Sequence, residues 1–125
     1  MAVTHYQQLK VWQAGMQLTR SVYLLSQQFP KHELYGLTSQ MRRSAVSVPA
    51  NIAEGHARNS TREFLHHISI AQGSLAELET ILMLAEDLGY CQSAETAQLL
   101  GQSDEEGKML RGLQKPLNSK INSSP

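Results

Sequence analysis

The sequence predicts an all-α protein, an up-down-up-down antiparallel four-helix bundle. Four stretches carry apolar residues at three- and four-residue spacing, which is the period of a helix. Short segments with proline, glycine or helix-capping residues separate these stretches. No stretch shows the alternation of a β-strand. Helices of about 20–28 residues joined by short loops favour antiparallel neighbours, so a bundle follows.

The 125 residues suit one domain, which we place at 1–117, with 118–125 as a C-terminal tail expected to fray. The hydrophobic share of 41% and the charged share of 18% are typical of a globular protein. A single cysteine, Cys91, allows no intramolecular disulfide, and the first residues do not form a signal-peptide pattern. No apolar run approaches the roughly 20 residues of a membrane span. We therefore expect a cytoplasmic protein without membrane contact.

The first helix is predicted over about 7–29. Thr4 and Gln7 have the spacing of a capping box, and Phe29-Pro30 ends the helix because a residue before proline avoids the α region. Its apolar row contains Val11, Gly15, Leu18, Val22, Leu25 and Phe29.

The second helix is predicted over about 33–57. Pro49 lies inside its pattern and removes one backbone donor, so we expect a kink rather than a break. Gly55 weakens the end of the helix. The apolar stripe contains Leu34, Leu37, Met41, Ala45, Val48 and Ile52.

The third helix has the strongest pattern. Ser60 and Glu63 form a capping box at its start, and Gly89 suits the position after its end. Ile70, Ile81, Leu84 and Leu88 widen the apolar face, which is typical of a helix that contacts an interface as well as a core. The 4-3 row contains Phe64, Ile68, Ala71, Leu75, Leu78, Leu82 and Ala85.

The fourth helix is predicted from Ser93, as its cap, to Leu117. Glu95 lies in the first turn, where a negative charge suits the helix dipole. Leu99, Leu100, Leu110, Leu113 and Leu117 carry the pattern.

Charge is balanced overall but unevenly distributed. The net charge is zero, which argues against a generally polybasic nucleic-acid binder. Residues 1–58 nevertheless hold six Lys or Arg side chains against two acids, and residues 59–88 hold one against five. This layout favours either attraction between neighbouring helices or subunits, or one basic face presented to a partner.

Two adjacent arginines, Arg42 and Arg43, point in different directions on the second helix. Arg43 begins a polar row with Ser47, Asn51 and Glu54 at +4, +4 and +3. The row is either a basic site for phosphate or an ion-pair network at a helix or subunit contact, for instance with Glu77 or Glu79. We expect the row to organise such a contact, and Arg42 to be the exposed ligand contact.

The candidate nucleic-acid-binding residues combine this pair with five further basic side chains. A solvated surface is the alternative for those five, although repetition around a symmetric oligomer strengthens a modest basic patch. The candidates are Arg42, Arg43, Arg58, Arg62, Lys10, Arg20 and Lys31.

No catalytic, metal-binding or cofactor-binding constellation converges in the sequence. Glu63 and His66 have the Glu-x-x-His spacing of di-iron bundles, but no second pair exists. Cys91 has no neighbouring histidine, and no phosphate-binding or nucleophile-elbow motif occurs. We therefore expect no catalytic residue, no metal, no cofactor and no enzymatic activity.

The stretch YGLTSQMRRSAVSVPANIAEG, residues 35–55, carries a family resemblance. With LKVWQ and FP before it and EF…IAQGSLAELET after it, the chain resembles the "four helix bundle protein" family. Members of that family are encoded in intervening sequences of bacterial 23S ribosomal RNA genes. The resemblance is strongest over about 6–90.

The resemblance implies a bundle that assembles as a homopentamer. A related group, the accessory proteins of diversity-generating retroelements, forms pentameric barrels that bind nucleic acid and a reverse transcriptase. No catalytic residue comes with the resemblance. The motif residues that the resemblance implies are Tyr35, Gly36, Gln40, Arg42, Arg43, Pro49, Asn51, Glu54, Gly55, Gly73, Ser74 and Glu77. Ser47 of the polar row is added to them as an expected interface residue.

Two functions remain open at this point. The first is a pentameric interaction protein whose basic surface binds RNA or DNA. The second is a scaffold that binds another protein, such as a reverse transcriptase, without direct nucleic-acid contact.

Overall fold

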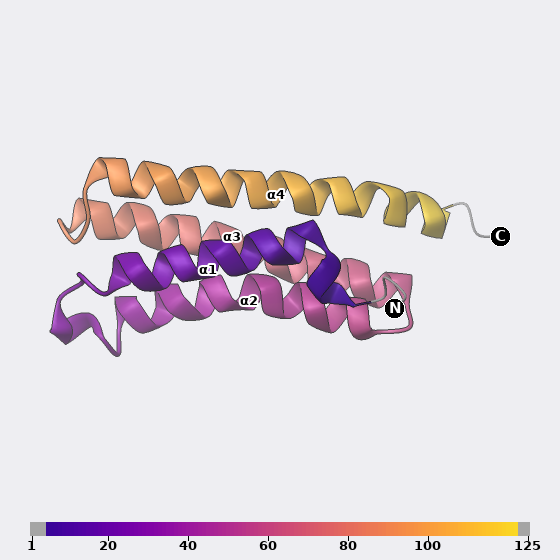
Figure 1. Ribbon diagram of the computed structural model, residues 1–125, viewed down its shortest axis with the longest axis horizontal. Coiled ribbons are helices and arrows are strands. Elements are labelled where there is room, and N and C mark those ends of the chain that lie inside the picture. Colours follow the sequence, from indigo (N-terminus) through magenta and orange to yellow (C-terminus); the bar gives the residue numbers. More distant parts are fainter. Residues whose placement is uncertain (1–4, 123–125) are drawn as a thin grey trace.

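The predicted up-down-up-down bundle is confirmed. The structure, a computed structural model, describes residues 5–122, in which four α-helices run in alternating directions (Figure 1). Two short 3-10 helices precede the first two of them. The elements are η1 (Tyr6–Gln8), α1 (Lys10–Ser26), η2 (Lys31–Glu33), α2 (Leu37–Ala57), α3 (Thr61–Asp87) and α4 (Ser93–Asn122).

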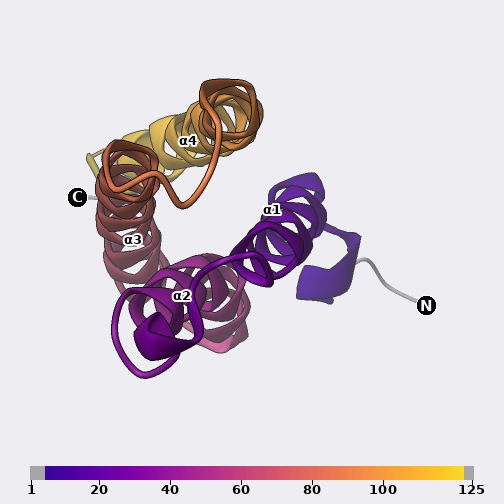
Figure 2. The ribbon, with the colours of Figure 1, turned by 90° about the vertical axis from the view of Figure 1, so that its left-hand side faces the viewer.

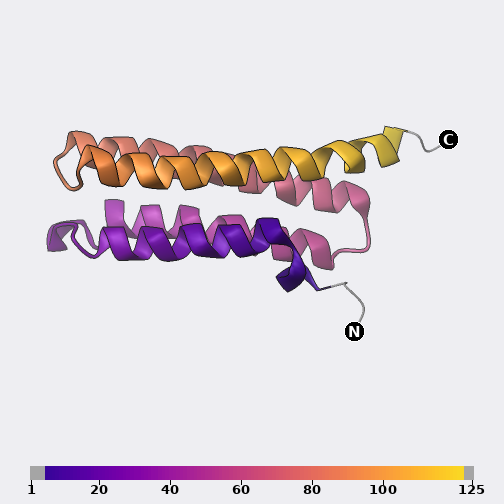
Figure 3. The same ribbon diagram turned by 45° about the horizontal axis from the view of Figure 1, so that its top comes forward.

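The helices follow one another around the bundle in chain order, as the end view in Figure 2 shows. Figure 3 separates two helical hairpins, α1–α2 and α3–α4, that lie side by side. The contact between α2 and α3 is the most extensive, and the contact between α1 and α4 is the smallest among the four neighbouring pairs. We call this last contact the α1–α4 seam.

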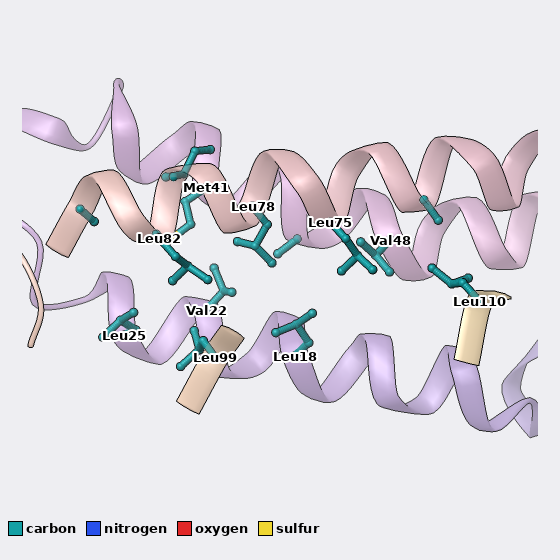
Figure 4. Packing of buried hydrophobic residues seen from close by; sticks show 14 of the residues in the cluster. Leu18, Val22, Leu25, Met41, Val48, Leu75, Leu78, Leu82, Leu99 and Leu110 are labelled. Atoms are coloured by element: carbon teal, nitrogen blue, oxygen red, sulfur yellow. The ribbon is translucent and has the colours of Figure 1, made fainter. Parts of the chain in front are cut away.

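All four helices contribute to one apolar core (Figure 4). Leu18 and Val22 of α1 meet Leu78 and Leu82 of α3 in its middle, and each of the four is at most 1% exposed. The predicted row of α3 is buried from Ile68 onward, because its 4-3 spacing keeps one stripe turned inward.

The ends of α3 form as predicted. The Ser60 hydroxyl accepts a hydrogen bond from the Glu63 amide over 3.2 Å, so Ser60 is the N-cap. After the other end, Gly89 has a φ of 79°, a conformation that favours glycine. The Tyr90 amide then bonds back to the Ala85 carbonyl over 2.9 Å, which closes a Schellman motif.

The second helix begins later than predicted. It starts at Leu37 rather than residue 33, because Gly36 precedes it in a non-helical conformation and η2 occupies the earlier residues. Leu34, expected in the apolar stripe, is therefore 46% exposed. The helix runs unbroken through Pro49 to Ala57, as expected.

The first and fourth helices also differ from the prediction at their ends. Helix α1 ends at Ser26, three residues early, and Thr4 lies outside the described residues. Ser93 is the first residue of helix α4 and not the residue before it, so it is not the predicted cap. The backbone amide of Gln92, the preceding residue, donates a hydrogen bond to the Glu95 carboxylate over 2.9 Å. Helix α4 continues to Asn122, so 118–122 are helical rather than tail, and 123–125 lie outside the described residues.

Helix α3 is the one described helix that is long and apolar enough to cross a membrane by length and composition. Its inner stripe is buried against α2 and α4, which is the environment of a bundle's core helix.

Candidate functional site

A hollow of about 360 Å³ lies between α2 and α3, and we call it the α2–α3 hollow. It collects a guanidinium, hydroxyls, an amide and a carboxylate, and all of its lining residues except Ser44 were expected to lie at a binding site or an interface. Its lining residues are Gln40, Arg43, Ser44, Ser47, Ser74 and Glu77.

A chain of hydrogen bonds fixes the floor of the α2–α3 hollow. The Ser74 hydroxyl donates to the Ser47 hydroxyl over 2.8 Å, and the Asn51 amide donates to the same Ser47 oxygen over 2.9 Å. The Asn51 carbonyl then lies 2.9 Å from Nδ1 of His67. The predicted row thus organises a helix contact through Ser47 and Asn51, because these side chains join α2 to α3.

The two arginines have exchanged the roles expected for them. Arg42 is half-buried: its Nε donates to the Ser26 hydroxyl over 2.8 Å, and its guanidinium lies 4.7 Å from the centre of the Tyr23 ring. Arg42 therefore packs α2 onto α1, and the expectation that it is the exposed contact was wrong. Arg43 is the exposed arginine, at the edge of the α2–α3 hollow.

The predicted ion pair between Arg43 and α3 is not formed within the described residues. Glu77 lines the same hollow but accepts from the Gln40 amide over 3.3 Å. Glu79 accepts a hydrogen bond from Ser103 of α4 instead. The guanidinium of Arg43 is therefore available to an anionic group from outside the chain.

Arg58 is held by two carboxylates at the turn between α2 and α3. Its Nη2 lies 3.2 Å from Glu54 and its Nη1 lies 3.6 Å from Glu63. All three side chains are about half-exposed, so these pairs are screened by water and contribute little to stability. Glu54, the last member of the predicted row, thus pairs with Arg58 of the next turn.

A second hollow, of about 320 Å³, lies beside the start of α3 and the end of α4. Arg62 of α3 and Lys120 of α4 line it with Ser60, Thr61 and Ile121. Two cationic side chains from distant parts of the sequence therefore meet at one end of the rod.

The seven candidate basic residues do not form one patch. Lys10 and Arg20 are exposed on α1, and Lys31 is exposed on η2 at the opposite end from Arg58 and Arg62. Arg42 lies between α1 and α2, and Arg43 between α2 and α3. The structure brings together only Arg58 and Arg62, at the α2–α3 turn.

Charge is separated along the rod. The end formed by the α2–α3 turn and the last turns of α4 we call the basic end; there Arg58, Arg62, Lys115 and Lys120 outnumber Glu54 and Glu63 (Figure 1). At the other end, formed by the α1–α2 and α3–α4 connections, Glu33, Glu86, Asp87 and Glu95 outnumber Lys31. This separation was hidden in the sequence because alternating helix directions bring distant segments to the same end.

Three motif residues differ in their surroundings: Gly55 lies where two helices are in close contact, and Gly73 and Tyr35 lie on the exposed surface. A Cβ added at Gly55 would lie 2.6 Å from the Cβ of His67, so this glycine permits close approach of α2 and α3. A Cβ added at Gly73 would meet nothing within 4 Å, and Tyr35 is 94% exposed. Gly73 and Tyr35 therefore have no packing role within one chain.

The apolar flank of α3 is also left uncovered. Ile70, Leu84 and Leu88 are 38%, 44% and 50% exposed, on the side where Gly73 lies. The expectation that this helix contacts more than a core is consistent with that exposure. Ile81 of the same flank is buried.

Two of the three buried polar residues of α4, Ser103 and Glu106, lie in its middle and were not predicted. Both lie between Leu99 and Leu110 at 4-3-4 spacing, which places them on the inner face of the helix. The spacing was the available signal, but their polarity hid it.

The remaining titratable groups do not assemble into a metal site. Among residues 5–122, no three His, Cys, Asp or Glu side chains come close enough together to hold an ion. Glu63, half of the Glu-x-x-His pair, is taken by Arg58.

The comparisons with known proteins agree with this fold. The profile of a family described as 23S rRNA-intervening sequence protein matches residues 7–112. A crystal structure of a protein with unknown function, from the S23 ribosomal protein family of Bacteroides thetaiotaomicron VPI-5482, matches with a TM-score of 0.78. The two chains are 23% identical, over 84% of this chain and 95% of that chain, which shows the fold alone. No curated protein matches.

Proposed function

The chain belongs to the 23S rRNA-intervening sequence protein family, and on that premise we propose that it is a non-enzymatic oligomeric protein that binds RNA or DNA through a basic surface. The basic end of the rod carries this proposal, because Arg62 and Lys120 converge there on one hollow. Phosphate contacts from Lys and Arg supply most of the affinity for nucleic acid without base recognition.

Assembly strengthens the same argument. We propose a homopentamer, which the sequence resemblance implies. Uncovered apolar side chains on α3 and the exposed Tyr35 support contacts between copies. In a ring of parallel rods, five basic ends lie on one side, and their potentials add. A neutral chain can in this way present a strongly positive face.

Binding is tested with the purified protein and labelled single-stranded RNA and duplex DNA of mixed sequence. We expect retention at about 50 mM salt, with log affinity falling linearly against log salt. The triple variant Arg58→Glu, Arg62→Glu, Lys120→Glu removes the basic end and is expected to abolish retention.

The matched control changes charge by the same amount elsewhere. Arg20→Glu, Lys31→Glu and Lys108→Glu lie away from the basic end, so this triple variant should keep most of the retention. Native mass measurement reports whether each variant still assembles. Absence of retention by the intact assembly at low salt contradicts nucleic-acid binding, and equal loss in both variants contradicts the assignment to the basic end.

The second candidate is a protein-binding scaffold. Exposed Tyr35 and the apolar flank of α3 favour it, since such side chains are also typical of protein interfaces. The resemblance to accessory proteins of diversity-generating retroelements makes a reverse transcriptase the proposed partner. Under this alternative, the basic-end variant keeps its protein partner in a pulldown while the unvaried protein never retains nucleic acid.

A further inference from the structure

Glu106 is a carboxyl group enclosed in the core of the bundle. Its side chain is 0% exposed, and neither of its two oxygens has a hydrogen-bond partner within the described residues. Burying a polar group without a partner costs free energy. The position therefore calls for a reason beyond packing.

The helices that face Glu106 leave space for its carboxyl group. A Cβ added at Gly15 of α1 would lie 2.9 Å from Oε2 of Glu106, so a side chain at this position would force the carboxyl group to shift. The same point is 3.5 Å from Pro49 of α2, a residue that has no backbone N–H to donate. Glu106 thus reaches across the α1–α4 seam to a place where neither of its oxygens finds a hydrogen-bond donor within the described residues.

Burial decides the charge of Glu106. It raises the pKa of this carboxyl from 4.5 to about 8, because the charged form loses its water and gains no cation. The side chain is therefore neutral in the closed bundle at pH 7. Any opening that returns it to water returns its pKa towards 4.5 and releases the proton.

The charged groups on the surrounding helices are exposed to solvent or bonded to other residues, and none of them bonds to Glu106. Arg20 of α1 and Arg43 and Glu54 of α2 are exposed. On α3, Glu79 accepts from Ser103 and His67 contacts Asn51. On α4, Lys108 pairs with Asp104 over 3.4 Å and with Glu105 over 3.5 Å. None of these groups contributes to the raised pKa of Glu106, whose cause is burial.

The α1–α4 seam is also the least fastened contact of the bundle. A side-chain hydrogen bond reaches Glu95 of α4 over 3.1 Å from Gln28, which lies two residues beyond the end of α1, near one end of the rod. By contrast, α4 is tied to α3 by a reciprocal pair of amides, Gln72 and Gln114, at 2.9 and 3.2 Å, and by Ser103 on Glu79.

We propose that the α1–α4 seam is a proton-operated joint. Neutral Glu106 lets α4 close against α1 and α2, and loss of its proton releases α4 from both while α3 retains it. The opened joint exposes the apolar inner sides of α1 and α4, including Leu18 and Leu110, to water.

Hydrogen exchange measured by mass spectrometry tests the joint between pH 6 and 9. The released α4 loses two of its three neighbours and frays, so its amides exchange. After division by the intrinsic exchange rate at each pH, this exchange is expected to rise about tenfold per pH unit up to about pH 8 and then level off. Amides of α2 and α3 that face each other serve as the internal reference and should change far less.

Two variants distinguish the effect of the Glu106 proton from the effect of side-chain packing. Glu106→Gln keeps the shape without a titrating group, so its α4 exchange should lose the pH dependence. Glu106→Leu fills the same space with an apolar side chain and should stay closed throughout. If Glu106→Gln does not fold, the leucine variant alone supplies the comparison.

Three results overturn the proposal. The first is corrected α4 exchange in the unvaried protein that does not change with pH. The second is the same pH dependence in a variant that lacks the carboxyl group. The third is an equal loss of protection in α2, α3 and α4, since that means one global unfolding and no joint.

Discussion

Thr19 of α1 donates its hydroxyl to the backbone carbonyl of Ala45 in α2, over 3.1 Å. That carbonyl is the acceptor that the amide of residue 49 would serve in an ordinary helix, and Pro49 has no amide hydrogen. The same hydroxyl also donates to the carbonyl of Gly15 in its own helix, over 2.8 Å, so the two carbonyls share its one proton. A side chain on α1 thus compensates for the proline in α2, which allows α2 to continue.

Replacing this hydroxyl tests the compensation. Thr19→Val is expected to lower the free energy of unfolding by about 1–3 kcal/mol, because the buried carbonyl of Ala45 loses its partner. Urea unfolding measures the change. In a Pro49→Ala background the helix supplies its own amide, so the same substitution should cost less. Thr80→Val, at an exposed hydroxyl on α3, is the control and should change little; an equal cost in all three cases contradicts the interpretation.

Gly55 and Gly73 should respond in opposite directions to alanine. Gly55→Ala is expected to destabilise the fold by about 1–2 kcal/mol, since the new methyl group meets His67 and Phe64 and α2 must move from α3. Gly73→Ala meets nothing and should stabilise the single chain by up to about 1 kcal/mol through helix propensity. Thermal unfolding compares them. A stabilising Gly55→Ala would show that the helices are not in close contact there.

Arg42 and Arg43 should separate stability from binding. Arg42→Ala is expected to lower the free energy of unfolding by about 0.5–2 kcal/mol, because it loses the Ser26 hydrogen bond and the Tyr23 ring contact. Arg43→Ala should leave stability nearly unchanged, and because Arg43 is exposed but lies outside the basic end, it should weaken retention on RNA or DNA less than the basic-end variant does. Urea unfolding and a binding titration on both variants measure the two effects. The reverse result would restore Arg42 as the exposed contact.

Glu33 links the start of α2 to Tyr90. The phenol donates to one carboxylate oxygen over 2.8 Å and the Leu37 amide donates to the other over 3.1 Å. The hydrogen bond from Tyr90, followed by that from the Leu37 backbone, lowers the pKa of Glu33 below 4.5. A lowered pKa contributes stability above pH 4.5 that is lost as the pH falls through the folded-state value.

Tyr90→Phe removes the larger of these causes. We expect its stability to depend less on pH between about pH 2 and 5 than that of the unvaried protein. Chemical unfolding at closely spaced pH values measures the difference. Tyr35→Phe is the matched control, because its phenol is exposed, and the pH dependence of that variant should match the unvaried protein.

The sequence was sufficient wherever the signal is local. The 4-3 row of α3 and the Ser60 cap depend on neighbours within one helix, and both formed as predicted. Partner choice between helices was not predictable: which of two adjacent arginines is buried depends on Tyr23 and Ser26 of α1. Glu106 was missed for a related reason, since the space for its carboxyl group depends on Gly15 of the facing helix.

The late start of α2 has a similar origin. The apolar pattern continues back to Leu34, so periodicity alone extends the helix too far. Glu33 ends this extension because its carboxylate bonds to the Leu37 amide from outside the helix. The hydrogen bond from Tyr90 to Glu33 fixes that arrangement, and the local sequence around Glu33 does not predict this contact.

The separation of charge along the rod has a consequence for how copies associate. Rods that lie side by side in opposite directions attract one another, whereas rods that lie in the same direction repel at both ends. A parallel ring would therefore assemble more readily as salt screens this repulsion. A polyanion bound across the basic ends of the ring would neutralise the repulsion among those ends. By thermodynamic reciprocity, whatever favours the ring then tightens the hold on the polyanion.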